Sequence, residues 1–397
     1  MSGPPSLLTT LLILLLGVAL ARISAGRLAR WAVPAILLEL GVGFLLGNSV
    51  LPLATIAPLE GLAQLGVLSL FFQVGLEVRG DLIASRRWVI LRTLAISALA
   101  PLLAFVPLRQ AFAMETPTAL LCVAALSATG TGVTLRVLAG RGAHQSPSGR
   151  TLVGVSVLDD LPAIGLLALA MASAGRGVAT PSGVPLQMLS GLLLALLSWL
   201  AFDRWARRRP PERPAGALAI LLLMIGSAWA GEATGFTSLL GALWGGVLLA
   251  RFSPPEQELR QVLVLMSEVC LPLYFISVGM RLPAAALLDR SAWLLAGFLV
   301  VVAVVCKLLC AFGISRRDRA AGVDRWVVAF GLIPRGLPGL VFATTALAGG
   351  LISASQFAAL VVMVSGTTVL GLLLLERRLS LLEGMAAAGS VGSGSLL

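Results

Sequence analysis

Two adjacent aspartates, Asp159 and Asp160, lie in the middle of a run of otherwise almost wholly apolar residues, 151–174. A charged side chain at the centre of a lipid bilayer costs at least about 2.5–3.5 kcal/mol, so a consecutive pair requires compensating partners. The same pair would also be tolerated in a soluble core helix, provided that its hydrogen bonds were satisfied. That second interpretation requires a soluble protein, so the rest of the chain decides between the two.

The composition of the chain is that of a membrane protein. Of its 397 residues, 58% are hydrophobic and 12% are charged, whereas soluble domains carry about 25% charged residues. Apolar runs of the length that crosses a bilayer recur from one end of the chain to the other. The net charge of +11 does not indicate nucleic-acid binding, because the basic residues stand in short gaps between these runs. The four cysteines lie inside apolar runs, so we expect neither disulfides nor a cysteine metal site.

We therefore expect an all-α polytopic membrane protein with about thirteen membrane-spanning helices in a single transporter domain, 1–397. The expected spans are 6–24, 31–48, 60–77, 88–108, 117–138, 150–173, 184–202, 214–231, 235–250, 259–280, 292–313, 325–347 and 355–375. Loops after odd-numbered spans carry most of the 29 basic residues, whereas the loops after even-numbered spans carry Arg109, Arg176, Arg281 and Arg290. By the positive-inside rule, the N-terminus lies outside and the C-terminus in the cytoplasm. The expected location is the cell (inner) membrane of a prokaryote.

Two halves of the chain resemble each other. The segment FFQVGLEV at 71–78 resembles FISVGMRL at 275–282, and GVGFLLG at 41–47 resembles WGGVLLA at 244–250. Corresponding spans lie an odd number of spans apart, so the two copies cross the membrane in opposite directions. Inverted repeats of this kind are typical of secondary transporters. The expected repeats are 31–173 and 235–375.

One span in each repeat is interrupted near its middle. Residues 127–134 read SATGTGVT, and residues 331–339 read GLIPRGLPG. Glycine and proline weaken helix interiors, and irregular backbone at membrane depth is tolerated only where it faces protein or a water-filled cavity. Two interrupted helices at equivalent positions of two inverted halves therefore predict the substrate site.

Charged residues inside the spans are expected to meet at this level. Lys307 is the only lysine of the chain, which predicts a position that needs an ammonium able to lose its proton, since arginine cannot do so. At about 1.5 Å per helical residue from the cytoplasmic face, several polar features lie at similar depth: Asp159, Asp160, Lys307, Arg335 and the break at 127–134. Consecutive helical residues point about 100° apart, so one aspartate should face the lysine and the other a cavity.

At these residues the chain resembles the monovalent cation:proton antiporter-2 family, and within it the NapA-type sodium/proton antiporters. The resemblance covers nearly the whole chain and depends on the order and spacing of short motifs. These motifs are 71–77, 128–134, 157–160, Glu268 with 272–275, 278–279, 307–309 and 333–336. The resemblance implies a homodimer with an NhaA/NapA-like fold, two crossed discontinuous helices and elevator-type alternating access. It places the ion-translocation core at about 88–173 and 292–375, dimerisation or scaffold helices at about 6–77 and 184–280, and a short flexible cytoplasmic tail at 379–397.

The resemblance also implies a function and roles for particular residues. Asp160 would bind the cation or proton, Asp159 would pair with Lys307, and the two adjacent aspartates would mark electrogenic exchange of Na⁺ or Li⁺ for H⁺, which serves sodium and pH homeostasis. Supporting broken-helix and core residues would be Ser127, Thr129, Thr131, Thr134, Arg335 and Glu268. The transported Na⁺ would contact Asp160, Asp159 and Thr129. The chain would not be an enzyme and would need no cofactor; its partners would be monovalent cations, protons, the bilayer and a second copy of itself.

Three glutamates are expected to be structural rather than ligands of the transported ion: Glu39, Glu77 and Glu268. Glu77 stands at the end of a span, where a charge costs little. Glu39 and Glu268 lie deeper, where a network with Arg92 or Arg335 is conceivable.

The chain departs from the family pattern at two places. Family members usually carry Arg-Gly-Glu followed by Val-Gly-Leu after the second break; here Leu337 and Pro338 replace the Glu and the Val, which removes a carboxylate that balances Arg335. Pro162, soon after the aspartate pair, is also unusual for the family. The preference between Na⁺ and K⁺ therefore stays open, with a K⁺/H⁺ antiporter of the same family as the first alternative.

Functions outside this family explain fewer of the residues. A sodium-coupled organic-anion symporter on a similar fold would use Arg335 and the helix N-termini at the breaks, but it would not need Asp159, Asp160 and Lys307 together. An intramembrane aspartyl protease needs two carboxylates that converge on one water, whereas adjacent residues diverge. A channel does not require an inverted repeat.

Overall fold

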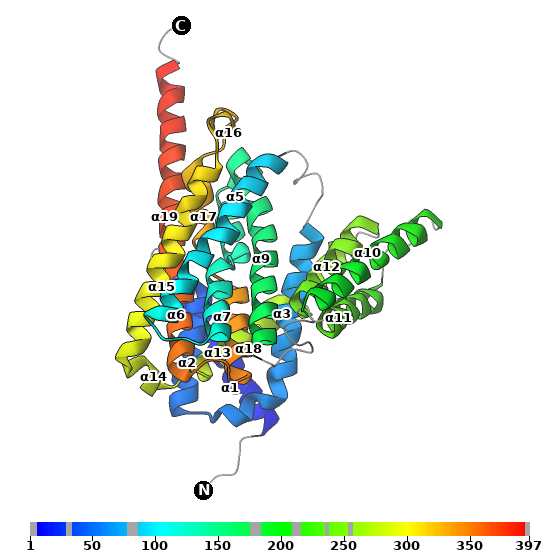
Figure 1. Cartoon of the computed structure of the whole chain (residues 1–397), viewed down its shortest axis with the longest axis vertical. Coiled ribbons are helices and arrows are strands. Elements are labelled where there is room, and N and C mark those ends of the chain that lie inside the picture. The colour runs from blue at the N-terminus through cyan, green and yellow to red at the C-terminus, as the bar shows by residue number, and fades with distance from the viewer. Residues whose placement is uncertain are drawn as a thin grey trace.

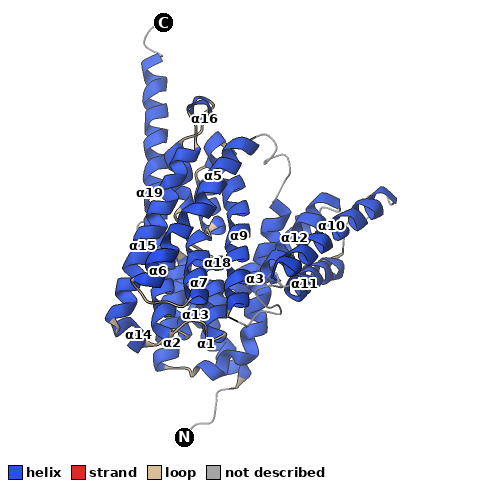
Figure 2. Cartoon of the chain, in the orientation of Figure 1, coloured by secondary structure: helices blue, strands red, loops and turns tan. Residues whose placement is uncertain are grey.

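The computed structural model describes residues 6–28, 34–77, 86–174, 184–208, 216–234, 238–252 and 257–393, and every regular element in these ranges is helical (Figure 2). Eight of these helical stretches are long and apolar enough to cross a membrane. Shorter apolar helices accompany them: Ala35–Ser49, Ala217–Ala233, Ser238–Arg251 and Pro338–Ala348. The expectation of an all-helical membrane protein is therefore confirmed.

The helices form two groups. The first group comprises α1 (Leu7–Leu28), α2 (Ala35–Ser49), α3 (Glu60–Glu77), α10 (Val184–Arg208), α11 (Ala217–Ala233), α12 (Ser238–Phe252) and α13 (Gln257–Met280). Here α3 packs against α12 and α13, α2 against α13, and α11 against α12. In Figure 1, α10, α11 and α12 lie on the opposite side of the molecule from α15 and α19.

The second group contains the charged residues singled out in the sequence. It comprises α5 (Arg87–Leu99), α6 (Phe105–Gln110), α7 (Thr116–Ser127), α8 (Thr131–Gly140), α9 (Pro147–Ser173), α15 (Arg290–Leu309), α17 (Arg325–Leu332), α18 (Leu337–Ala348) and α19 (Ala354–Ser393). Helix α9 packs against α5, α7 and α17, while α19 packs against α15, α17 and α18. Helix α9 continues through Pro162, so this proline does not interrupt the helix that carries the aspartate pair.

Two helix crossings in the first group use equivalent residues of the two similar segments. At Gly43 in α2, an added Cβ would lie 2.1 Å from the carbonyl oxygen of Ile276 in α13. At Gly246 in α12, an added Cβ would lie 2.1 Å from the carbonyl oxygen of Phe72 in α3. Gly43 corresponds to Gly246 in the alignment of the two segments, and Phe72 corresponds to Ile276. Both crossings therefore bring backbones into direct contact at a position where only glycine fits.

Two expected elements differ in the structure. The expected span 88–108 divides into α5, a 3₁₀ turn (Ala100–Ala104) and α6, because Pro101 lacks the amide hydrogen that would continue the α-helical ladder. The tail from 379, expected to be flexible, continues α19 to Ser393. The reason is that 376–388 contains strong helix formers and no proline, and that Arg378 and Glu383 form ion pairs with other segments.

Candidate functional site

The two interrupted helices cross at their breaks. Residues 128–130 separate α7 from α8, and residues 333–336 separate α17 from α18. The amide nitrogen of Gly130 donates a 2.7 Å hydrogen bond to the carbonyl oxygen of Pro334. A Cβ at Gly130 would lie 2.9 Å from the carbonyl carbon of Arg335, and a Cβ at Gly336 would lie 2.8 Å from the Cα of Gly130. Glycine is required at both positions because the two backbones touch.

Lys307 is fully buried beside this crossing. Its ammonium forms an ion pair with Oδ2 of Asp159, and both side chains have no exposed surface. The same ammonium donates to the carbonyl oxygen of Ser127 at 2.9 Å and to Oγ of Ser97. An ammonium has three N–H groups, so these three acceptors satisfy it completely.

Asp159 is held from two sides. Its Oδ2 accepts from Lys307 and from the hydroxyl of Thr129, at 2.5 Å. Its Oδ1 has no hydrogen-bond partner among the described residues. The carboxylate of Asp159 is therefore engaged by α15 and by the break between α7 and α8.

Asp160 has a different environment from its neighbour. It is buried, with 4% of its surface exposed, and its Oδ1 accepts from the backbone amide of Thr129 at 3.4 Å. No described side-chain cation lies within ion-pair distance of it. Asp160 instead lines a cavity of about 630 Å³ together with Thr129, Gly130 and Gly336. The consecutive carboxylates thus point to a lysine and to a cavity, as the helical geometry requires.

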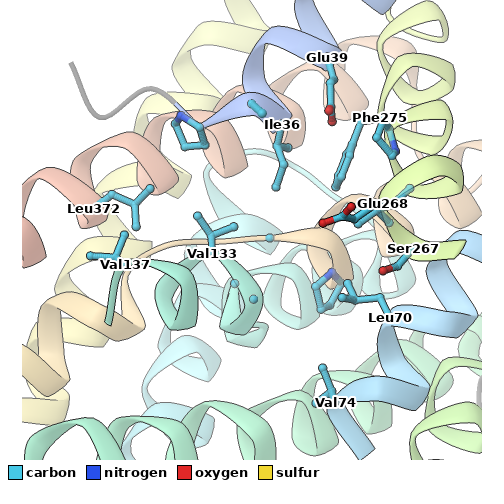
Figure 3. A pocket seen from close by; sticks show the side chains of 18 of the residues that line it. Ile36, Glu39, Leu70, Val74, Val133, Val137, Ser267, Glu268, Phe275 and Leu372 are labelled. Atoms are coloured by element: carbon cyan, nitrogen blue, oxygen red, sulfur yellow. The ribbon is translucent and has the colours of Figure 1, made fainter. Parts of the chain in front are cut away.

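The cavity lies between the two groups of helices (Figure 3). The first group contributes Glu39 from α2, Leu70 and Val74 from α3, and Glu268 and Phe275 from α13. Figure 3 shows the carboxylates of Glu39 and Glu268, from two different helices, directed into the cavity. The lining is therefore acidic, which raises the local concentration of cations relative to bulk solution.

Arg335 is buried and bonded to backbone carbonyls. Its guanidinium donates to the carbonyl oxygen of Ala128, at the C-terminal end of α7, and to that of Ala303 at 3.4 Å. Within the described ranges, no carboxylate lies within ion-pair distance of it. The partial negative charge at a helix C-terminus favours a cation there. The end of α7 thus supplies part of the compensation that a carboxylate at 337 would have given.

The remaining predicted residues have other roles or positions. Thr134 donates at 2.9 Å to the carbonyl oxygen of Gly331 and so joins α8 to α17. Glu268 is exposed on α13, in the first group of helices, and reaches the site only through the cavity. The side chains of Thr131 and Glu77 lie outside what the structure describes.

Arg92, one of the two arginines considered for a network with the deep glutamates, pairs with another carboxylate. Its ion pair is with Asp318 at 2.6 Å, in the short helix α16 (Arg316–Ala320) between α15 and α17. Glu39 is buried and lines the cavity. The backbone carbonyl of Glu268 accepts from Arg22 at 2.6 Å. These glutamates therefore face the cavity rather than a helix end.

Sequence reasoning missed two residues of the site. Ser97 accepts from Lys307, and Thr368 donates its hydroxyl to the carbonyl oxygen of Arg335. Both are hydroxyls inside apolar runs, which is a weak signal because such side chains usually bond their own helix backbone. The carbonyl acceptors at Ala128 and Ala303 carry no sequence signal.

The chain is similar to known membrane transporters. Residues 11–376 match the family model described as sodium/hydrogen exchanger, transmembrane. The Na⁺/H⁺-K⁺ antiporter GerN of Bacillus cereus is 26% identical over 352 residues, which are 87% of this chain and 90% of that protein. The high-affinity Na⁺/H⁺ antiporter NhaS3 of Synechocystis is 26% identical over 320 residues, 77% of this chain and 68% of that protein.

A solved structure shows the same fold. The sodium proton antiporter MjNhaP1 of Methanocaldococcus jannaschii superposes with a TM-score of 0.69 at 16% identity, covering 98% of this chain and 99% of that one. At this identity the similarity establishes the fold alone. The family match covers far more than half of the chain, and the site described above lies within it. The chain therefore belongs to the sodium/hydrogen exchanger family of membrane transporters, and it is a cation/proton antiporter rather than an enzyme.

Proposed function

We propose that this antiporter exchanges Na⁺ or Li⁺ for protons electrogenically, and that Asp160 is its ion-binding carboxylate. The observation that carries the proposal is the divergence of two adjacent aspartates. Asp159 is engaged by Lys307 and Thr129, whereas Asp160 lines an acidic cavity and has no cationic partner among the described residues. A hard cation such as sodium prefers oxygen ligands, which Asp160 and Thr129 supply.

Coupling between the two ions follows from competition at one site. Two carboxylates side by side in a low-dielectric site do not readily both ionise, so proton binding and cation binding exclude one another. A cation that enters beside Asp160 also weakens the attraction of Asp159 for Lys307. A buried lysine that loses its counter-charge releases its proton more easily. Exchange of more than one proton for one sodium is therefore expected, and the cycle moves net charge.

The wider architecture is proposed on the same basis. The order of the helices supports about thirteen spans. The distribution of basic residues supports an outside N-terminus and a cytoplasmic C-terminus by the positive-inside rule. The matched glycine crossings of α2 on α13 and α12 on α3 support the two inverted repeats. In an elevator mechanism, the second group of helices moves against the first, which forms the dimer. Arg22, in the last turns of α1, and Glu376, in α19, also line the cavity that reaches Asp160. Both lie toward the cytoplasmic side in the proposed topology, which supports an inward-open state.

A K⁺/H⁺ antiporter is the alternative within the family. One relative carries both ions in its printed name, the Na⁺/H⁺-K⁺ antiporter GerN, and the replacement of the family Glu by Leu337 removes a carboxylate from the core. A sodium-coupled organic-anion symporter is less well supported, because the guanidinium of Arg335 is already bonded to two carbonyls.

Transport by reconstituted protein tests the proposal. Proteoliposomes with an imposed pH gradient and an internal pH dye would receive Na⁺, Li⁺ or K⁺ in separate additions. We expect proton movement on addition of Na⁺ and Li⁺, and a rate that changes when valinomycin and K⁺ set a membrane voltage. A response to K⁺ alone would transfer the assignment to the K⁺/H⁺ alternative, and a voltage-independent rate would contradict electrogenic exchange.

A further inference from the structure

A second cavity, of about 720 Å³, lies away from the transport site. Its walls come from the turn before α9, from the segment that joins α16 (Arg316–Ala320) to α17, and from residues 378–383 of α19. None of the residues around Lys307 and the helix crossing lines it. This cavity therefore joins three segments that are far apart in the sequence.

The charges on its walls do not balance. Two of its four arginines are paired with its two carboxylates: Arg141 with Glu383 at 2.9 Å, and Arg378 with Asp324 at 2.5 Å. Arg319 and Arg325 also line the cavity. In the described part of the chain, neither has a carboxylate within ion-pair distance. The cavity therefore carries two more guanidinium groups than carboxylates.

The other polar side chains of the cavity are already engaged. The hydroxyl of Ser148 accepts from the amide of Asp324 at 2.8 Å, and the hydroxyl of Ser146 donates to the carbonyl of Ala143 at 2.7 Å. The guanidinium of Arg325 lies over the ring of Trp326, with its central carbon 5.0 Å from the ring centroid. The free hydrogen-bonding capacity is therefore that of the guanidinium groups, and their planar fork of donors fits phosphate oxygens.

The cavity is larger than a lone phosphate would fill. A volume of about 720 Å³ is within the usual range of sites for small organic ligands, about 300–1,000 Å³. Apolar and aromatic side chains complete the lining: Val323, Trp326, Leu379 and Leu382. A ligand with a phosphate group and a larger organic part matches both the excess arginines and this apolar part of the lining.

We propose that this cavity binds a phosphate ester, with its phosphate between Arg319 and Arg325 and its organic part against Leu379 and Leu382. The same chemistry is found in a soluble nucleotide and in the headgroup of an anionic phospholipid. Because α17 leads directly into the break at 333–336, such a ligand would also hold α17 in position against α19.

Arginines near the cytoplasmic ends of spans are expected from membrane orientation alone, so the experiment needs a control for charge. Arg316 and Arg317 on α16 provide it, because they are exposed and do not line the cavity. The double variants Arg319→Ala/Arg325→Ala and Arg316→Ala/Arg317→Ala lose the same charge from the same region. Arg325→Lys is a milder variant that keeps the charge and removes the planar fork.

Binding is measured by thermal shift and isothermal titration on the full-length protein in detergent. The probes are AMP, inorganic phosphate, dihexanoyl phosphatidylglycerol and, as the neutral lipid, dihexanoyl phosphatidylcholine. We expect saturable binding of AMP or of phosphatidylglycerol, which identifies the source, and weaker binding of phosphate alone. The cavity double variant should lose about tenfold or more in affinity, and Arg325→Lys should lose part of it, while the control variant binds as the wild type does. The proposal is overturned if no probe binds saturably. It is also overturned if the control variant loses as much affinity as the cavity double variant and Arg325→Lys binds as the wild type does, because charge alone would then explain the binding.

Discussion

The ammonium of Lys307 and the carboxylate of Asp159 form an ion pair in which both side chains are completely buried. Helix α15 supplies the lysine and helix α9 the aspartate. The last residue of α7, Ser127, adds its carbonyl, and Thr129 in the break between α7 and α8 adds its hydroxyl. Because a buried charge is stable only with its partners in place, the pair ties three parts of the fold together at the depth of the cavity. It also leaves Asp160 as the one of the two carboxylates that lines the cavity.

Replacement of Lys307 tests whether this pair takes part in transport. Lys307→Ala leaves Asp159 buried without a counter-charge, so the free energy of unfolding should fall by about 3–5 kcal/mol. Lys307→Arg keeps the charge, but an arginine stays protonated at any accessible pH. We expect Lys307→Arg to fold and to lose charge movement, or to shift its activity to more alkaline pH, in current recordings on solid-supported membranes. An arginine variant with the wild-type pH profile and current would show that Lys307 is a structural counter-charge only.

Asp160→Asn should abolish cation-dependent proton movement, because an amide neither ionises nor releases a proton. The substitution is nearly isosteric, and Asp160 has no ion pair to lose in the described structure, so the melting temperature should change little. Glu376→Gln is the matched control, since Glu376 lines the same cavity without contacting the helix crossing. The check is the pH-dye assay with Na⁺ pulses; exchange at the wild-type rate by the asparagine variant would move the ion site elsewhere.

Gly130→Ala should disrupt the crossing of the interrupted helices. The added methyl group would lie 2.9 Å from the carbonyl carbon of Arg335 and from the amide nitrogen of Gly336, and backbone atoms there have no room to withdraw. Overpacking of this kind costs about 1–3 kcal/mol, and we expect transport to be lost. Gly132→Ala is the control, because no atom lies within 4 Å of a Cβ at that position. Equal activity of the two variants would mean that the breaks are not in contact.

The glycine crossings in the first group of helices give a prediction about the repeat. Gly43→Ala and Gly246→Ala each place a methyl group 2.1 Å from a carbonyl oxygen of the facing helix. Both should lower the melting temperature by a similar amount, because their environments correspond. Gly41→Ala, which meets nothing within 4 Å, should be neutral. Destabilisation by only one of the first two variants would contradict the equivalence of the crossings.

A pH-dependent contribution to stability is expected at the start of α17. Burial raises the pKa of Asp324, but the ion pair with Arg378 and the backbone amides of Val327 and Trp326 outweigh it and leave that pKa below its ordinary value. A carboxyl group with a lowered pKa in the folded state stabilises the fold above its unfolded pKa, and this contribution is lost as the pH falls through the lowered value. Asp324→Asn should therefore lower the free energy of unfolding at pH 7 by about 1 kcal/mol or less, the range for a partly exposed pair, and lower the melting temperature with it. The difference from the wild type should shrink below about pH 4, as measured by differential scanning fluorimetry.

The sequence alone determined where the helices lie, where two of them are interrupted and which charged residues lie at membrane depth. Hydrophobic run length located the helices, since about twenty apolar residues are needed to cross a bilayer. The clusters at 127–134 and 331–339 located both interruptions, because glycine and proline act on the local backbone whatever packs around it. The cost of a charge at membrane depth singled out Asp159, Asp160, Lys307 and Arg335. Local backbone chemistry and bilayer energetics are properties that a sequence carries directly.

Only the tertiary structure decided how these parts meet. The rotation of α9 determines that Asp159 faces Lys307 and Asp160 the cavity; the helical period requires the two to diverge but does not say which side each one takes. The partners of Arg335 are carbonyl groups of Ala128 and Ala303, and every residue has a carbonyl, so no residue type marks them. The continuation of α19 to Ser393 also depends on contacts with distant segments, such as Arg141 with Glu383. Such contacts depend on the relative placement of helices far apart in the chain, which packing determines and a single sequence does not encode locally.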